Sequence, residues 1–188
     1  MLPGLAEVQT TTHFTARVRL TRKSPKTQSS QTPCARVGRL IKAADIYRLY
    51  FHGPAYQVLE LAWRDRDHIV GQMAGNLPAN HSPAGKPTLF EPRLIELCFQ
   101  TAGLWEMSVL GRFGLPNYIQ RVSLLRSPQN SIGSLFAVVS PNADGQSFDA
   151  EVIDTQGTKY LQLVGYRTVA LPNRVEAESL KAFQAVGV

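Results

Sequence analysis

Alternating hydrophobic and polar residues run through most of the chain and predict a series of short β-strands. In the first of them Phe14, Val18 and Leu20 share one side of the extended chain, and basic and polar residues share the other. Clusters of glycine, proline and asparagine separate these segments. The predicted strands cover residues 12–20, 56–63, 68–77, 118–125, 133–140, 146–154 and 159–171, and a short amphipathic piece covers 43–50.

Residues 92–110 form the one segment that predicts a long helix. Pro92 suits its first turn, and a glycine follows its last residue as a stop signal. Apolar side chains point in nearly every direction around this helix, so we expect other structure to surround it. Arg93, Glu96 and Gln100 break the pattern, because at 100° per residue they share a stripe about 60° wide.

The predicted order is two or three strands, one buried helix and then four strands. The economical arrangement is a single antiparallel sheet curled around the helix, which is an α+β fold. We expect an N-terminal strand and basic flexible linker at 1–42, the sheet-and-helix domain at 43–172, and a tail or short helix at 173–188. A chain of 188 residues suits one such domain.

The composition narrows the range of possible functions. The longest uninterrupted apolar run covers only residues 135–139, whereas a membrane helix needs roughly 20 residues. The first residues lack the basic start and apolar centre of a secretory signal. The two cysteines, Cys34 and Cys98, argue against a disulfide framework and against a zinc site built from cysteines. We therefore expect a cytoplasmic protein with no membrane span, no metal and no organic cofactor.

Positive charge is concentrated in one segment. Residues 17–48 hold nine Lys/Arg against Asp45 alone, while the remainder of the chain is close to neutral. Because residues 24–33 are rich in Ser, Thr, Gln and Pro and contain no aromatic residue, the segment is typical of a solvated linker. Two alternatives remain open: the segment attracts an acidic protein partner, or, with less support, a nucleic acid.

Two motifs resemble those of a known family. Residues 50–57 (YFHGPAYQ) are similar to a GYxYGPxFQ segment, and residues 91–100 (EPRLIELCFQ) to an HPxxxDxxxQ segment that starts a helix. Both belong to the second half of the dehydratase domains of polyketide synthases and polyunsaturated fatty acid synthases. The resemblance covers residues 43–172 and implies a hotdog fold, in which a sheet wraps one long helix. Residues 12–20 would then be the last strand of a first hotdog.

The resemblance also implies a reaction and its residues. Family members dehydrate β-hydroxyacyl thioesters held by phosphopantetheine on an acyl carrier protein, with a histidine as base and the motif aspartate as acid. Here Glu96 takes the place of that aspartate, and Glu91 replaces the motif histidine. The family's HxxxGxxxxP motif, which carries the base, does not occur in the sequence.

Glu96 is the predicted acid, aided by Gln100 and His52. The residues expected to border the substrate are Tyr50, Gly53, Pro54, Tyr56 and Arg93. Each residue also has a purely structural interpretation. Glu96 could pair with Arg93, Gln100 could be a satisfied amide, and His52 could be a turn residue. Tyr50 and Tyr56 could simply pack in the core.

Three functions remain open on this sequence. The first is a dehydratase-type hotdog whose missing histidine comes from a second hotdog. The second is an inactive hotdog that binds acyl chains or scaffolds a synthase, and the third is a thioesterase that uses a carboxylate near the central helix. Because a lone hotdog exposes a sheet edge, we expect a homodimer or a pairing with another hotdog. No nucleic acid or membrane partner is expected.

Overall fold

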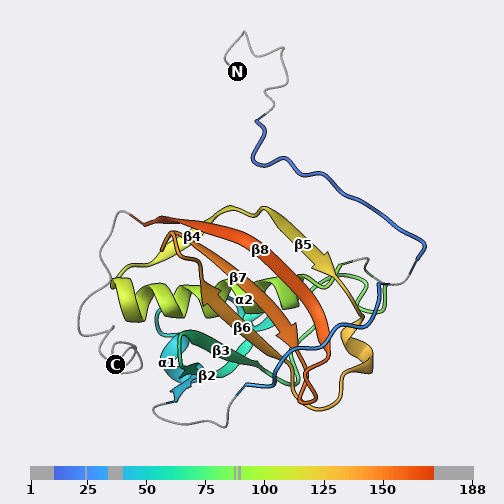
Figure 1. The fold of residues 1–188 in the computed structure, drawn as a ribbon, viewed down its shortest axis with the longest axis horizontal. Coiled ribbons are helices and arrows are strands. Elements are labelled where there is room, and N and C mark those ends of the chain that lie inside the picture. Colours follow the sequence, from blue (N-terminus) through green and yellow to red (C-terminus); the bar gives the residue numbers. More distant parts are fainter. Residues whose placement is uncertain (1–10, 24, 34–39, 87, 89, 172–188) are drawn as a thin grey trace, which may run out of the picture.

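The computed structural model describes residues 11–23, 25–33, 40–86, 88 and 90–171. These residues form one eight-stranded sheet whose named strands all pair antiparallel (Figure 1). The strand order is β1-β2-β3-β6-β7-β8-β4, and β5 also pairs with β8. The strands are β1 (Ile41–Lys42), β2 (Leu59–Asp65), β3 (His68–Met73), β4 (Gly114–Tyr118), β5 (Arg121–Leu124), β6 (Phe136–Pro141), β7 (Ser147–Ile153) and β8 (Lys159–Ala170).

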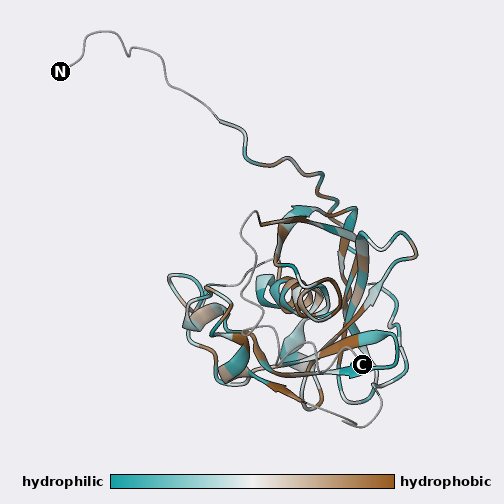
Figure 2. Cartoon of the chain, turned by 90° about the vertical axis from the view of Figure 1, so that its left-hand side faces the viewer, coloured by the Kyte–Doolittle hydropathy of each residue, from teal (hydrophilic) through white to brown (hydrophobic). Residues whose placement is uncertain are grey.

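The long helix α2 (Pro92–Trp105) lies against this sheet, and Figure 2 looks along its axis with the strands curving around it. The helix continues into one π-helical turn, Glu106–Leu110, and ends at Gly111, whose φ of +60° is the left-handed conformation common after helix ends. Three short helical turns complete the fold: α1 (Ala43–Ile46), η1 (Pro54–Tyr56) and η3 (Pro128–Asn130). The predicted α+β architecture, one antiparallel sheet around one long helix, is confirmed.

The core lies between α2 and the inner face of the sheet. In β6 alternate residues, Ala137 and Val139, are buried, as the period of two predicts, whereas β3 buries four consecutive residues. Each buried Val or Leu side chain contributes about 1.5–3 kcal/mol relative to an exposed one. Core residues include Leu94, Leu97, Ala102 and Leu104 of α2, together with Ala137, Val139, Phe148, Val152, Leu161 and Leu163 of the sheet.

Two predicted strands differ from those observed. Residues 12–20 form no strand, and all of them are exposed, because within the described chain no sheet edge covers the apolar side that includes Phe14 and Val18 (Figure 1). The strand expected at 118–125 is the shorter β5, and a strand that was not predicted, β4, precedes it; both pair with β8. The chain breaks between them opposite Gly165, which bends β8 with a φ of +64°. The tail predicted at 173–188 lies outside the described residues, and the domain boundaries at 42 and 172 stay predictions.

The linker is attached to the sheet at one point. Lys159 N donates to Gln28 O at 2.9 Å, and Ser30 N donates to Gly157 O at 2.8 Å, next to a bridge between Ser29 and Thr158. A Cβ atom at Gly157 would collide with Ser30 O, and its φ of +79° also favours glycine. The turn between β7 and β8 therefore holds the linker in place. Among the described residues, no helix is long and apolar enough to cross a bilayer.

Gly71 sets how closely the sheet approaches α2. A Cβ atom at this position of β3 would lie closer than van der Waals contact to Thr101 Oγ1 and to Leu59. We expect Gly71→Ala to lower the free energy of unfolding by about 1–3 kcal/mol, because the added methyl overpacks a full core. Urea denaturation measures this, with Gly75→Ala as control, since nothing lies within 4 Å of a Cβ there. Equal stability of the two variants would contradict this account of the packing.

Candidate functional site

The three polar residues of the α2 stripe separate in the structure. Arg93 turns toward the preceding loops, where its Nε donates to Ala55 O at 2.9 Å and its second guanidinium nitrogen contacts Pro78 O. Glu96 and Gln100 instead turn toward His52, which precedes the η1 turn. The pairing of Arg93 with Glu96 is therefore not the arrangement observed. Arg93 holds the loops that frame the site, and its expected contact with substrate stays a prediction.

Glu96 is the centre of the polar cluster. Its Oε1 lies 2.9 Å from His52 Nε2 and accepts a second hydrogen bond, also of 2.9 Å, from Gln100 Nε2. The side chains of Glu96 and His52 are 20% and 19% exposed, so both are reachable from solvent while most of their surface is covered. A carboxyl group in contact with two nitrogen atoms at a partly open position can exchange protons with a bound molecule.

Gln100 connects the cluster to the core and is only 2% exposed. Its Nε2 also donates to Tyr56 O at 2.8 Å, and its Oε1 accepts from the hydroxyl of Tyr47 at 2.8 Å. Tyr47 was not predicted from the sequence as a site residue. It lies 53 positions before Gln100, and only the folding of the chain brings the two together.

Two aromatic rings hold His52 in place. Phe51 stacks on its imidazole with a centroid distance of 4.8 Å, and Tyr50 meets it edge-on at 5.5 Å. His52 Nδ1 is buried and has no hydrogen-bond partner among the described residues. Gln57 Nε2 donates to His52 O at 3.1 Å and fixes the backbone beside the ring. The imidazole therefore presents one nitrogen to Glu96 and keeps the other unused.

The expected substrate-contacting residues lie around this cluster in different settings. Tyr50 is 6% exposed, its hydroxyl donates to Gln100 O at 2.7 Å, and burial raises its pKa well above the usual range. Only a glycine at position 103 leaves room for that hydroxyl. Gly53 and Pro54 are exposed at the start of η1, next to His52. Tyr56 is half-buried and reaches the site through its carbonyl oxygen. Contact of these residues with a substrate stays a prediction.

A fully buried carboxylate lies at the C-terminal end of the helix, and the sequence analysis missed it. The Glu106 side chain is fully buried, and its Oε1 accepts from Arg112 at 2.7 Å and from Thr168 Oγ1 at 2.6 Å. Its Oε2 has no partner among the described residues. A lone acid in the apolar run 101–110 is the signal that could have identified it. The contacts link the end of α2 to β8 and have no part in the His52 cluster.

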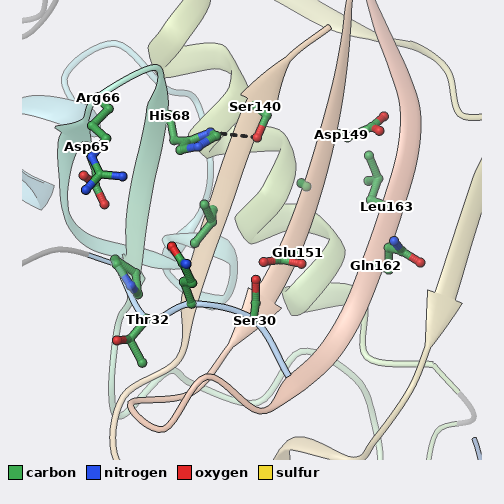
Figure 3. Close-up of a pocket in the computed structure, with 14 residues that line it drawn as sticks. Ser30, Thr32, Asp65, Arg66, His68, Ser140, Asp149, Glu151, Gln162 and Leu163 are labelled. Carbon is green, nitrogen blue, oxygen red and sulfur yellow. Dashed lines mark hydrogen bonds between the residues drawn. The ribbon is translucent and has the colours of Figure 1, made fainter. Parts of the chain in front are cut away.

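A separate pocket of about 390 Å³ lies on the outer face of the sheet, on the side away from α2 (Figure 3). His68 Nδ1 lies 2.8 Å from Ser140 Oγ, and Glu151 forms a 2.6 Å ion pair with Lys159. Asp149 accepts a hydrogen bond from Gly165 N at 2.9 Å. The linker residues from Ser30 to Pro33 line one side. These polar groups lie away from α2, whereas residues of the two sequence motifs meet at Glu96, so we place the candidate chemistry there. Among the described residues, no three His, Cys, Asp or Glu side chains gather in a way that could hold a metal ion.

Comparison with known proteins identifies the class of this fold. The dehydratase domain of the CurF module of curacin polyketide synthase superposes with a TM-score of 0.61 at 19% identity, covering 77% of this chain and 54% of its own. A trans-AT polyketide synthase dehydratase domain from Brevibacillus brevis gives a TM-score of 0.61 at 15% identity, covering 80% of this chain and 56% of its own. A structure from work on dehydratase substrate selection in the borrelidin and fluvirucin polyketide synthases gives a TM-score of 0.59 at 19% identity, covering 83% of this chain and 54% of its own. The chain thus spans about half the length of these structures, which share its hotdog fold.

The sequence itself identifies the family. The family profile described as polyketide synthase dehydratase N-terminal domain matches residues 10–178, so the chain belongs to the polyketide synthase dehydratase family. No curated protein matches the sequence significantly. The profile is named for the N-terminal domain, whereas the motifs at 50–57 and 91–100 resemble the second half of the double hotdog. Assignment of the chain to that second half stays a prediction.

Cys98 tests how firmly α2 is enclosed at the site. The residue is 1% exposed, and burial, with a smaller contribution from the charge of Glu96, raises the pKa of its thiol well above the usual range. At pH 8 an ordinary thiol is partly ionised, but this one stays protonated. We expect iodoacetamide to label Cys98 at least roughly a hundredfold more slowly in the folded protein than in urea. Mass spectrometry of the Cys98 peptide measures both rates, and equal rates would show that the helix is not enclosed.

Proposed function

We propose that this chain is a dehydratase-type hotdog that acts on β-hydroxyacyl thioesters carried by an acyl carrier protein in polyketide or fatty acid biosynthesis. Glu96 is the general acid, and Gln100 and His52 orient it. The observation that carries the proposal is the carboxyl group of Glu96, which lies 2.9 Å from His52 Nε2 and from Gln100 Nε2 on a partly exposed face of the central helix. Membership of the dehydratase family supports the same reaction class.

The reaction needs an acid and a base on different sides of the substrate. The base takes the proton from the α-carbon, the C–C double bond forms, and the C–O bond at the β-carbon breaks. Glu96 gives its proton to the departing oxygen, which leaves as water. The carboxyl group is then recharged by the proton collected at the base or by solvent.

His52 is in direct contact with Glu96, which bears on the source of the base. A histidine whose Nε2 lies 2.9 Å from the acid leaves no room for a substrate between the two groups. We therefore assign His52 to holding and orienting Glu96, and we propose that the opposing base comes from a second hotdog. The solved dehydratase domains are about twice as long as the region they share with this chain, which supports a two-hotdog unit.

An acyl carrier protein is the proposed partner. Carrier proteins of acidic surface would be attracted by the basic segment, whose Arg17, Arg19 and Arg22 are exposed in the structure. The second hotdog is either another copy of this chain or a different chain that bears the histidine. A cytoplasmic location belongs to the same proposal.

The decisive experiment incubates the protein with 3-hydroxyacyl and 2-enoyl carrier-protein thioesters and follows the change of one water by mass spectrometry. A histidine-bearing hotdog dehydratase half is added in a parallel series. We expect interconversion in the series that supplies the base. Glu96→Gln should lower the rate about 10²–10⁴-fold, the usual contribution of a general acid. Glu151→Gln is the matched control, because Glu151 lies on the outer face of the sheet, in the pocket away from α2.

Other outcomes would favour the competing functions. Release of free acid instead of water exchange would indicate a thioesterase. Binding of acyl chains without turnover, unaffected by Glu96→Gln but abolished by Ala102→Trp on the buried side of α2, would indicate an inactive binding module. Either result, obtained with the second hotdog present, would contradict the dehydratase proposal.

A further inference from the structure

The side-chain amide of Gln100 can adopt only one of its two orientations in this site. Its Nε2 faces two acceptors, Tyr56 O at 2.8 Å and Glu96 Oε1 at 2.9 Å, and its Oε1 faces the hydroxyl of Tyr47 at 2.8 Å. Rotating the amide by 180° would bring its oxygen against two other oxygens. Both hydrogens of Nε2 and the acceptor Oε1 are therefore used, as a buried amide requires.

The backbone of β2 fixes the direction of the Tyr47 hydroxyl. Leu59 N donates to Tyr47 Oη at 2.7 Å, and a backbone N–H can only donate, so the phenol oxygen accepts there. The single phenol hydrogen is left to donate to Gln100 Oε1. Burial raises the pKa of Tyr47 well above its usual range, so the hydroxyl remains a donor throughout the pH range of an assay. Because the Tyr47 hydroxyl accepts from the Leu59 backbone, it must act as a donor toward Gln100 Oε1.

The two oxygens of Glu96 are made unequal by this chain of hydrogen bonds. Oε1 accepts from Gln100 and lies against His52 Nε2, both at 2.9 Å. Oε2 has no hydrogen-bond partner within the part of the chain that the structure describes. In the tautomer that places a hydrogen on His52 Nε2, Oε1 accepts two N–H hydrogens and is a poor place for a third, so a proton on this carboxyl resides on Oε2.

We propose that Tyr47 is a positioning residue: it locks the Gln100 amide so that Glu96 Oε1 is held as an acceptor and Oε2 carries the proton that Glu96 donates. This inference rests on the proposed dehydratase function and deepens it. In the reaction the O–H bond at Oε2 breaks, and its hydrogen joins the departing hydroxyl, which takes the electron pair of the C–O bond and leaves as water. The base removes the α-hydrogen.

Tyr47→Phe tests the proposal, because it removes one oxygen and keeps the ring. We expect kcat to fall by roughly tenfold while KM changes less than twofold, since the substrate is still bound but the acid is less well oriented. In a Gln100→Met background the substitution Tyr47→Phe should cause no further fall in kcat, because Tyr47 acts through Gln100. An independent, additive fall would overturn the proposal.

Tyr160→Phe is the matched control for a merely structural loss. Tyr160 is also buried, and its hydroxyl donates to Asp154 at 2.9 Å, at the end of the sheet where β7 turns into β8. Both variants should lower the melting temperature, but only Tyr47→Phe should lower kcat per folded molecule. Equal kcat values for the two variants would overturn the proposal.

A second measurement separates this proposal from the dehydratase function itself. Both Gln100 Nε2 hydrogens are donated inside the protein, so they should exchange slowly with solvent, as followed by NMR of the labelled side-chain amide. We expect exchange to be roughly tenfold faster in Tyr47→Phe and unchanged in Tyr160→Phe. If the wild-type protein shows no turnover with the histidine-bearing hotdog present, the dehydratase proposal fails. Unchanged exchange in Tyr47→Phe would overturn the role of Tyr47 whether or not the protein turns over.

Discussion

A buried primary amide must have both of its hydrogens donated and its oxygen satisfied, and at Gln100 this requirement organises the whole site. The amide connects the central helix to Tyr56, the last residue of η1, and to Tyr47, which follows α1. Because each partner also holds another element, the position of the candidate acid is determined by the core and not by a surface loop. A site of this kind is rigid before any ligand arrives, which is the condition for effective acid catalysis.

The enclosure of α2 both enables and limits the site. Close packing at Gly71 brings the sheet directly against the helix, and the sheet covers the helix on several sides (Figure 2). Much of α2 is buried, so a polar group on this helix reaches solvent only at its partly exposed positions. Glu96 is one of them, about one-fifth exposed beside His52. The arrangement limits access of water to the carboxyl group while leaving one of its oxygens available, which suits a group that must hand over a proton without losing it to bulk solvent.

The sequence predicted the helix, most strands and the grouping of Glu96 with Gln100, because each depends on a local period that burial then enforces. The predictions failed where the structure depends on contacts between distant parts of the chain. The alternation at residues 12–20 is typical of a strand, yet in the described chain no edge pairs with it. Arg93 lies about one turn from Glu96, but its Nε donates to the backbone oxygen of Ala55 instead. Tyr47 meets Gln100 only after the sheet has closed around the helix, so no local pattern could reveal it.

The attachment of the linker has a mechanical consequence. Between the exposed residues 11–23 and the sheet, the chain is fastened by the backbone of Gln28 and Ser30 to the turn that joins β7 and β8. A force applied to the N-terminal segment would act first on these hydrogen bonds, which lie at the end of β7 and β8. The force would pass into the sheet along β7 and β8 and not through α1, η1 or the helix that carries Glu96. A load on the N-terminal segment is therefore taken up by the β7–β8 turn, at a distance from the contacts around Glu96.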